Sequence, residues 1–321
     1  MCLILVLRRK MANKKPARTS DKKSSTKSKT EAAKTAKVKP AVVTSEEAAP
    51  ATGKAVFKGF FAKKGDPDET ILTIFKKPRI YGALMGELIG TMLLAMLLLT
   101  LGVQPLYILF GCIGIYLAVF TLSGANLNPL VTVAMMVTRR MSVIRGVLYI
   151  LAQVVGAWFG LLIINGFRLG SGTETELPAM GELTGDIFWV VALVELVGAF
   201  IIGFAFVRAL QYKRKPLAFA FTVTSAITLA IIVGIVVSQS FFEFTETTFV
   251  YNPAIALMYQ ILPTAADNFG QLMGNICLAL LAYVIFPMVG GIIGFFISDV
   301  ASKLNGECCC MGCACCKKEE E

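Results

Sequence analysis

The stretch SGANLNPLVT, residues 123–132, holds an Asn-Pro pair that returns in the other half of the chain as YNPA, residues 251–254. The two elements are Asn128-Pro129-Leu130 and Asn252-Pro253-Ala254, and each follows an apolar segment. Proline fixes φ and lacks an N–H group, so it is favoured at the first position of a helix, and asparagine is a preferred N-cap. The sequence therefore predicts two short helices that begin at equivalent points of the two halves.

The two predicted helices, over residues 130–137 and 254–261, are too short to cross a membrane. If they meet end to end at mid-membrane, their positive dipole ends and the two asparagine carboxamides point at one place. This arrangement suits a pore that admits neutral polar molecules and rejects cations.

The composition is that of a polytopic membrane protein. Hydrophobic residues make up 56% of the 321 residues, charged residues make up 16%, and the mean hydropathy is +0.70. Of the 31 lysine and arginine residues, 20 precede Tyr81. Long apolar stretches separated by short charged gaps predict membrane-spanning helices. The chain has no histidine, which excludes a histidine-based metal site, catalytic triad or pH switch.

Six apolar segments are long enough to cross a membrane. They run over residues 81–101, 106–122, 144–164, 187–207, 217–237 and 275–297. Basic residues precede the first segment and follow the second, fourth and sixth, whereas the gaps after the third and fifth carry mainly acidic residues. The positive-inside rule therefore predicts that both termini are cytoplasmic.

Both ends of the chain differ from its apolar middle. Residues 1–75 are rich in Lys, Ser, Thr, Ala and Pro, and such a segment cannot bury enough apolar surface to fold. We expect a disordered, basic cytoplasmic tail that is attracted to anionic lipid rather than to nucleic acid. Residues 301–321 form a second cytoplasmic tail with the cluster CCCMGCACC. Three interpretations remain open for it: palmitoylation, a soft-metal site through Cys310 and Cys313, or a plain reduced tail.

The two halves of the apolar region repeat one another, over about residues 81–166 and 187–297. ELIG in the first span matches ELVG in the fourth, and QVVGAWFG in the third span matches PMVGGIIG in the sixth. Each half holds three spans, which is an odd number, so the second copy enters the membrane inverted. The pattern predicts an inverted-topology repeat with its functional site where the two repeats meet.

The matching acids of this repeat are Glu87 and Glu195. Carboxylates inside apolar membrane helices are costly and are usually functional. We expect each to accept hydrogen bonds from backbone N–H groups of the adjoining loop. The alternative is a carboxylate relay for proton-coupled transport.

Residues 123–132 resemble the first pore loop of the aquaporin, or major intrinsic protein, family, whose usual form is SGxHxNPAVT. Tyr251-Asn252-Pro253-Ala254 resembles the second pore loop. The resemblance implies an all-α membrane protein with six transmembrane helices and two re-entrant half-helices, in a channel domain over residues 76–300. It also implies a homotetramer with one pore per subunit, no cofactor, and passive flow of water or small neutral solutes across the lipid bilayer.

The chain departs from the usual family pattern at three loop positions. Leu130 replaces the alanine of the first NPA, Asn126 replaces the loop histidine, and Ile255 stands where the family usually places the arginine of its selectivity filter. An arginine there would bind water and repel cations.

The resemblance assigns the remaining filter positions by counting along the chain and by alignment. The second loop supplies Phe249, three residues before Asn252, and the second span supplies Ile108, or Phe110 if two residues are missing from the count. For the fifth span, an alignment on Pro216-Leu217-Ala218, rather than a count, points to Ile227. The predicted filter thus has no charge and almost no hydrogen-bonding side chain. Either the pore passes larger or less polar solutes, or a hydrophobic constriction closes it.

The sequence therefore predicts an aquaporin-like channel with a divergent, apolar filter. One alternative is an inverted-repeat secondary transporter that is coupled to protons through its buried acids. Another is a membrane scaffold or sensor with a degenerate, non-conducting pore. We expect no enzyme, because the apolar core shows neither a nucleophile–base constellation nor a phosphate loop.

Overall fold

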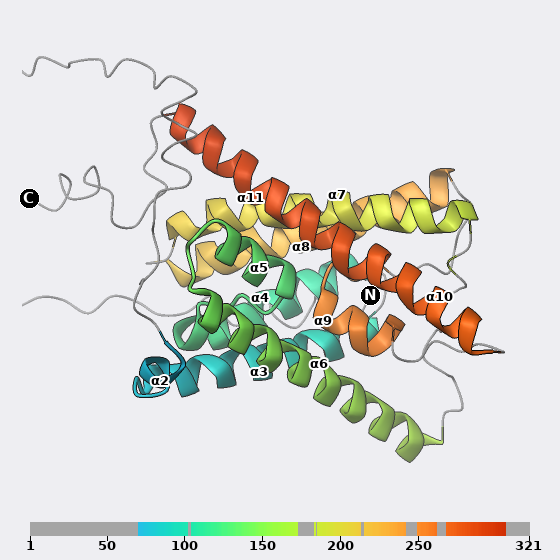
Figure 1. Cartoon of the computed structure of the whole chain (residues 1–321), viewed down its shortest axis with the longest axis horizontal. Coiled ribbons are helices and arrows are strands. Elements are labelled where there is room, and N and C mark those ends of the chain that lie inside the picture. Colours follow the sequence, from blue (N-terminus) through green and yellow to red (C-terminus); the bar gives the residue numbers. More distant parts are fainter. Residues whose placement is uncertain are drawn as a thin grey trace, which may run out of the picture. The chain divides into compact units, whose positions relative to one another are not determined.

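Long apolar helices make up most of the described chain (Figure 1). The computed structural model describes residues 70–101, 104–172, 183, 185–212, 215–241, 249–261 and 268–305. The predicted basic tail up to residue 69 and the cysteine cluster with Cys310 and Cys313 lie outside these residues.

The described helices follow one another in the order that the repeat predicts. They are α2 (Ile71–Ile74), α3 (Arg79–Leu101), α4 (Pro105–Ser123), α5 (Pro129–Val137), α6 (Val143–Ser171), α7 (Gly185–Ala209), η2 (Leu210–Tyr212), α8 (Pro216–Phe241), α9 (Pro253–Ala256), η3 (Leu257–Ile261), α10 (Phe269–Leu280), η4 (Leu281–Ile285) and α11 (Phe286–Leu304).

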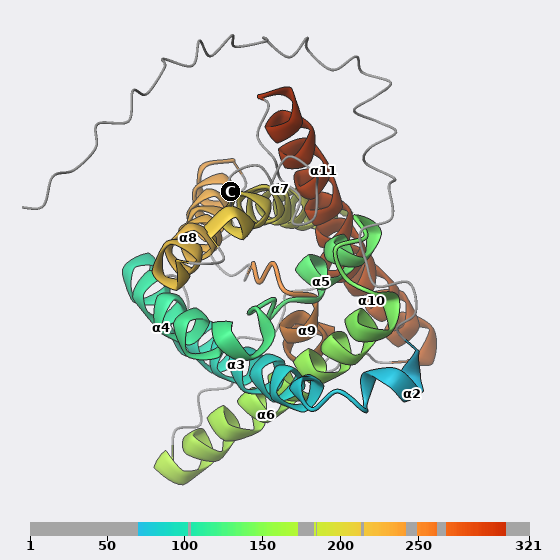
Figure 2. The ribbon, with the colours of Figure 1, turned by 90° about the vertical axis from the view of Figure 1, so that its left-hand side faces the viewer.

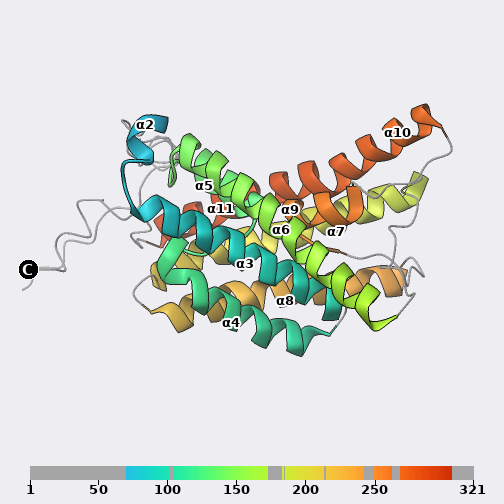
Figure 3. The same cartoon turned by 90° about the horizontal axis from the view of Figure 1, so that it is seen from below.

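Six of these stretches are long and apolar enough to cross a membrane, and each contains one of the six predicted spans. The third and sixth are longer than predicted, at Val143–Ser171 and Phe269–Leu304. The sixth contains Pro287, which cannot donate a backbone hydrogen bond and whose ring crowds the carbonyl one turn earlier. The helix widens into the π-helical turn η4 immediately before this proline. Figure 3 shows α10 and α11 as successive parts of this last span.

The packing of the helices follows the repeat. In the first half α3 packs on α4 and α6, and in the second half α7 packs on α8 and α11 in the same way. Contacts between α4 and α8 join the two halves. Viewed along the long helices, α5 and α9 lie inside the ring that these helices form (Figure 2). The predicted inverted repeat is thus the architecture of the described region.

Glycines allow the closest helix pairs to touch through their backbones. Gly156 on α6 faces the carbonyl oxygen of Leu88 on α3, and Gly290 on α11 faces the carbonyl oxygen of Leu196 on α7. A Cβ atom at either glycine would overlap that oxygen. Small residues at such positions let membrane helices approach closely, and here the repeat uses the same device twice.

The basic gaps of the sequence meet at one end of the bundle. Arg140, in the turn after α5, forms a buried ion pair with Asp299 near the end of α11. The guanidinium of Arg208, at the end of α7, donates to the hydroxyl of Ser302 at 2.8 Å. Three gaps that the positive-inside rule assigns to one side of the membrane are therefore joined by direct contacts.

The backbone contact at Gly290 gives a stability prediction. We expect Gly290→Ala to destabilise the folded protein by about 1–3 kcal/mol, because the added methyl group meets a helix backbone that cannot rotate away. Thermal unfolding in detergent measures this effect.

The matched control is Gly114→Ala on α4, where an added Cβ atom meets nothing within 4 Å. This variant is expected to keep its unfolding temperature or to gain slightly, since alanine favours a helix by about 0.5–1 kcal/mol over glycine. Equal unfolding temperatures for Gly290→Ala and the unaltered protein would contradict the close-packing argument.

Candidate pore and its loops

The two Asn-Pro elements begin helices, as the sequence predicts. Asn128 is the N-cap of α5, and its side-chain oxygen accepts from the backbone N–H of Leu130 at 3.0 Å. Asn252 is the N-cap of α9, and its side-chain oxygen accepts from the N–H of Ala254 at 3.1 Å. The second short helix differs from the expectation, because its α-helical part ends at Ala256 and continues as the π-helical η3.

The two asparagines also bind each other's loops. The amide nitrogen of Asn128 donates to the carbonyl of Tyr251 at 2.7 Å, and the amide nitrogen of Asn252 donates to the carbonyl of Leu127 at 2.9 Å. This crossed pair of hydrogen bonds joins elements that lie 123 and 125 residues apart. Each carboxamide uses one N–H group in this contact and carries a second one.

Both loop residues that accept these bonds have a left-handed backbone. Leu127 has a φ of +53° and Tyr251 a φ of +48°. Such a conformation costs about 1–3 kcal/mol for a residue other than glycine and persists where its surroundings fix it. Here the turn of the backbone aims the carbonyl of each residue at the opposite asparagine.

The predicted acids hold the N–H groups of the same two loops. The carboxylate of Glu87 accepts from the N–H of Asn126 at 3.0 Å and of Leu127 at 2.8 Å. The carboxylate of Glu195 accepts from the N–H of Val250 at 2.8 Å and of Tyr251 at 3.0 Å. Both acids are fully buried. Each loop is thus fixed by an acid of its own half and an asparagine of the other.

The first loop has an additional side-chain network. The amide of Gln153 donates to Glu87 at 2.7 Å and lies 2.9 Å from the hydroxyl of Thr132. The hydroxyl of Thr132 donates to the carbonyl of Asn128, and Thr91 donates to the carbonyl of Leu127. Sequence reasoning did not assign these three residues a role.

Among the described residues, the second loop has no copy of this network, because the repeat changes residue type there. Pro287 stands at the position of Gln153 and Ala256 at that of Thr132. A comparison of the two repeats position by position would have pointed to Gln153 as a residue with a role in the first loop alone.

Glycines behind the loops follow the repeat as well. The side chain of Leu127 packs on Gly90 of α3, and the ring of Tyr251 packs on Gly198 of α7. Each glycine lies three residues after the buried acid of its helix. A Cβ atom at either position would overlap the loop side chain.

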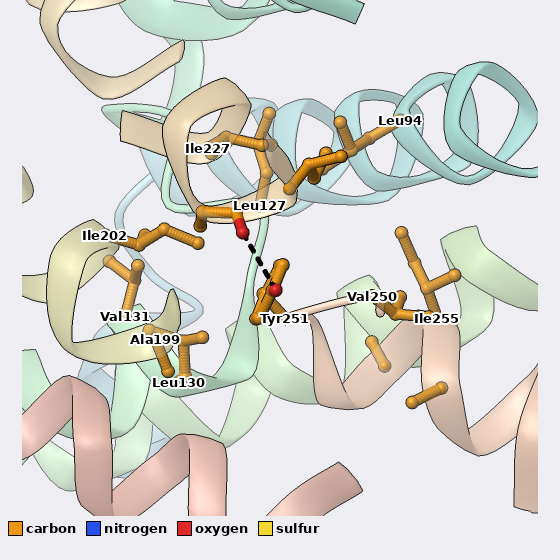
Figure 4. Close-up of a cluster of buried hydrophobic side chains, with 14 of the residues drawn as sticks. Leu94, Leu127, Leu130, Val131, Ala199, Ile202, Ile227, Val250, Tyr251 and Ile255 are labelled. Carbon is orange, nitrogen blue, oxygen red and sulfur yellow. Dashed lines mark hydrogen bonds between the residues drawn. The ribbon is translucent and has the colours of Figure 1, made fainter. Parts of the chain in front are cut away.

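The replacement of alanine by Leu130 in the first NPA element is compensated on α11. Leu130 is fully buried, and a Cβ atom on Gly291 would lie 2.8 Å from its side chain. The close-up also places Ala199 of α7 next to Leu130 (Figure 4). The larger side chain therefore fills space left by small residues on two neighbouring helices.

The two alternatives for the second-span filter position lie on different faces of α4. Ile108 is fully buried and shares its face with Cys112 and Tyr116, whereas Phe110 is 69% exposed. Of the two, Ile108 is the residue that faces the interior.

On the fifth span, the residue beside Phe249 is a glycine. Phe249 lies against Gly234 of α8, where an added Cβ atom would be 2.8 Å from the phenylalanine ring. Ile227 lies seven residues earlier, about 10 Å along the helix. In the close-up Ile227 lies with Leu94 and Leu127, away from Ile255 (Figure 4). The residue of α8 at the level of Phe249 is therefore Gly234, and the assignment of Ile227 to the filter stays a prediction.

Ile255 occupies the position one turn into the second short helix. It is 1% exposed, and Figure 4 shows it near Val250. The side chains of Ile108, Phe249 and Ile255 carry no hydrogen-bonding atom.

Within the described residues no group of three or more Cys, Asp or Glu side chains could hold a metal ion. The described cysteines are Cys112, which is buried, and Cys277, which is exposed.

Known proteins with similar sequences include plant aquaporins. The chain is 31% identical to aquaporin PIP1-1 of Oryza sativa subsp. japonica over 122 residues, which cover 36% of this chain and 41% of that protein. It is 30% identical to aquaporin PIP2-5 of the same plant over 100 residues, which cover 29% of this chain and 33% of that protein. These matches span about two fifths or less of the relatives' length.

A solved structure with a similar fold is the aquaglyceroporin from Plasmodium falciparum. The TM-score is 0.54, the sequence identity is 19%, and the similarity covers 68% of this chain and 96% of that chain. The family pattern described as major intrinsic protein matches residues 74–298, which include every helix from α3 to α10 and most of α11. The chain therefore belongs to the major intrinsic protein family of multi-pass membrane channels.

Proposed function

We propose that this protein is a passive transmembrane channel for water or small neutral solutes. The observation that carries the proposal is the crossed pair of hydrogen bonds between Asn128 and Asn252 and the carbonyls of the opposite loops. It brings two helix N-termini and two carboxamides to one place in the bundle. The names of the similar plant aquaporins and of the parasite aquaglyceroporin point to the same class of permeant.

The central site selects by charge. Helix N-termini carry partial positive charge, so two of them facing one lumen raise the energy of a cation there. The second N–H group of each asparagine offers a hydrogen bond to a neutral solute. A water molecule or a hydroxyl group is thereby oriented without a charged side chain in the path.

The narrow filter is apolar in this proposal. Ile108, Phe249 and Ile255 line it, and Gly234 of α8 takes the position expected for Ile227. A permeating water finds no side-chain partner there, and each hydrogen bond that it leaves unmade costs about 1–3 kcal/mol. Small, weakly polar solutes lose less, so the filter favours them relative to water.

The buried acids support the loops rather than carry protons. Each carboxylate accepts two or more backbone N–H bonds. A proton relay would require a carboxylate to release these donors in every cycle and to leave them unsatisfied inside the membrane, where each unpaired group is costly.

A second candidate is a non-conducting membrane scaffold or sensor. The observation that favours it is the burial of the filter residues, since Ile108 is 0% and Ile255 is 1% exposed. Apolar side chains that meet across a lumen close it by excluding water. Absence of any solute or water flux would identify this case.

We further propose a homotetramer in the lipid bilayer, with one pore per subunit and both termini cytoplasmic. The contacts of Arg140 with Asp299 and of Arg208 with Ser302 support this orientation, because they gather the basic gaps at one end.

Stopped-flow light scattering on proteoliposomes tests the function. Water, glycerol, urea and ammonia are applied in turn, and vesicles without protein are the reference. We expect at least one of these permeants to cross faster than in empty vesicles, with a rate that rises linearly with its gradient. Saturation at low solute concentration would favour the transporter.

The role of the acids gives a prediction about protons. Flux through the unaltered protein is expected to stay the same when a protonophore collapses the proton gradient. The variants Glu87→Gln and Glu195→Gln are expected to lower the yield of folded protein, because an amide turns a donor toward a backbone N–H. The flux that remains in each variant stays independent of the gradient. Uptake that stops with the protonophore in the unaltered protein would overturn this assignment.

The apolar filter gives a prediction about selectivity. We expect Ile255→Arg to raise water permeability relative to the other solutes, because it adds donors and a positive charge at the constriction. The measured quantity is the ratio of water to solute permeability in matched vesicles. Ile255→Met keeps the position apolar and is the control, with a ratio close to that of the unaltered protein. A ratio that Ile255→Arg leaves unchanged would show that residue 255 lies outside the constriction.

A further inference from the structure

Tyr251 is held in the second loop by its backbone, and its side chain makes further contacts with α8. Its N–H is held by Glu195 and its carbonyl by Asn128. Its side chain extends beyond the loop, and its hydroxyl donates to the backbone carbonyl of Ala230 on α8 at 2.9 Å. This bond is the dashed line in Figure 4. The residue is 1% exposed, so the bond is shielded from water.

The first repeat shows how large a side chain is needed to fill the space between the loop and the helix behind it. Leu127 holds the equivalent position, with nearly the same φ and the same packing on a glycine. A leucine is therefore large enough to fill the space behind the loop. The outer ring atoms and the hydroxyl of Tyr251 reach α8 and have no counterpart in the first half.

The extra part of the ring lies next to a filter residue. The rings of Phe249 and Tyr251 are stacked, with centroids 6.2 Å apart and planes 19° from parallel. Both rings crowd Gly234 of α8, where an added Cβ atom would overlap the hydroxyl oxygen of Tyr251 and lie 2.8 Å from Phe249. The two aromatic side chains thus occupy the space that the missing side chain of Gly234 leaves on α8; we call this space the recess at Gly234.

We propose that Tyr251 is a positioning residue for selectivity, which holds the ring of Phe249 in the recess at Gly234 and so keeps it back from the path of the solute. The assignment rests on the proposed channel function. The hydroxyl bond to Ala230 fixes the tyrosine ring, the stacked tyrosine ring fixes Phe249, and the missing side chain at Gly234 gives both rings their space. Release of Phe249 narrows the passage, and the largest permeant is affected most.

The test is the variant Tyr251→Phe, which removes the hydroxyl bond and keeps the ring. The readout is the permeability of the largest solute that the unaltered protein passes, divided by its water permeability; where water alone passes, it is the water permeability itself. We expect this readout to fall by about threefold or more, the order of effect that the loss of one buried hydrogen bond produces. Gly234→Ala is expected to act in the same direction, because its methyl group displaces Phe249.

A double-mutant cycle separates positioning from a general loss of stability. In a Phe249→Ala background, Tyr251→Phe is expected to change the readout by less than in the unaltered protein, since no ring remains to be positioned. The matched control is Tyr149→Phe on α6, which removes a hydroxyl bond of 3.1 Å to the carbonyl of Ser123 on α4. This control is expected to leave the readout unchanged.

The outcomes are distinct. An unchanged readout in both Tyr251→Phe and Gly234→Ala, with flux retained, overturns the role of Tyr251 and leaves the channel function standing. Equal effects of Tyr251→Phe with and without Phe249 also overturn it. Absence of flux in the unaltered protein overturns the channel function and this role together.

Discussion

The crossed hydrogen bonds between the two Asn-Pro loops are the interaction on which the rest of the structure depends. An irregular backbone inside a membrane must satisfy its N–H and C=O groups without water. Here the N–H groups of each loop bind the acid of the same half, and a carbonyl of each loop binds the asparagine of the other half. Neither loop is therefore satisfied alone, and the two halves must fold against one another.

The two halves support their loops by different means. In the first half, Gln153 and Thr132 extend the hydrogen bonds of Glu87 into a side-chain network. In the second half, the tyrosine ring spans the distance from α7 to α8. The first solution draws its side chains from α3, α5 and α6. The second solution ties the loop to α8, which also packs against Phe249. In the proposed channel, the contacts that support this loop therefore also shape the filter.

The sequence predicted the features that local chemistry and the repeat encode together. The six spans follow from the composition. The Asn-Pro caps and the buried acids each occur once in either half, so an error in assigning one of them shows up when it is compared with its partner in the other half. The filter position that we propose on α8 could not be obtained in this way, because the connection from α8 to Asn252 is longer than the one from α4 to Asn128. The alignment on Pro216-Leu217-Ala218 therefore pointed to Ile227, whereas the residue of α8 that lies beside Phe249 is Gly234. The ion pair between Arg140 and Asp299 was also out of reach, since its members are 159 residues apart and share no motif.

The three loop residues that depart from the usual family pattern have different surroundings. These surroundings indicate which of the changes affects only the packing and which affects the proposed filter. Leu130 is matched by Gly291, so the change from alanine keeps the helix contact filled and alters no exposed chemistry. Asn126 still gives its N–H to Glu87, a bond that any residue except proline can make. Ile255 lies near Val250 and puts an apolar side chain where the family pattern has a donor (Figure 4). The other residues of the proposed filter, Ile108 and Phe249, carry no charge either. The fold accommodates all three changes, and in the proposed channel the third is the one among them that changes the chemistry of the constriction.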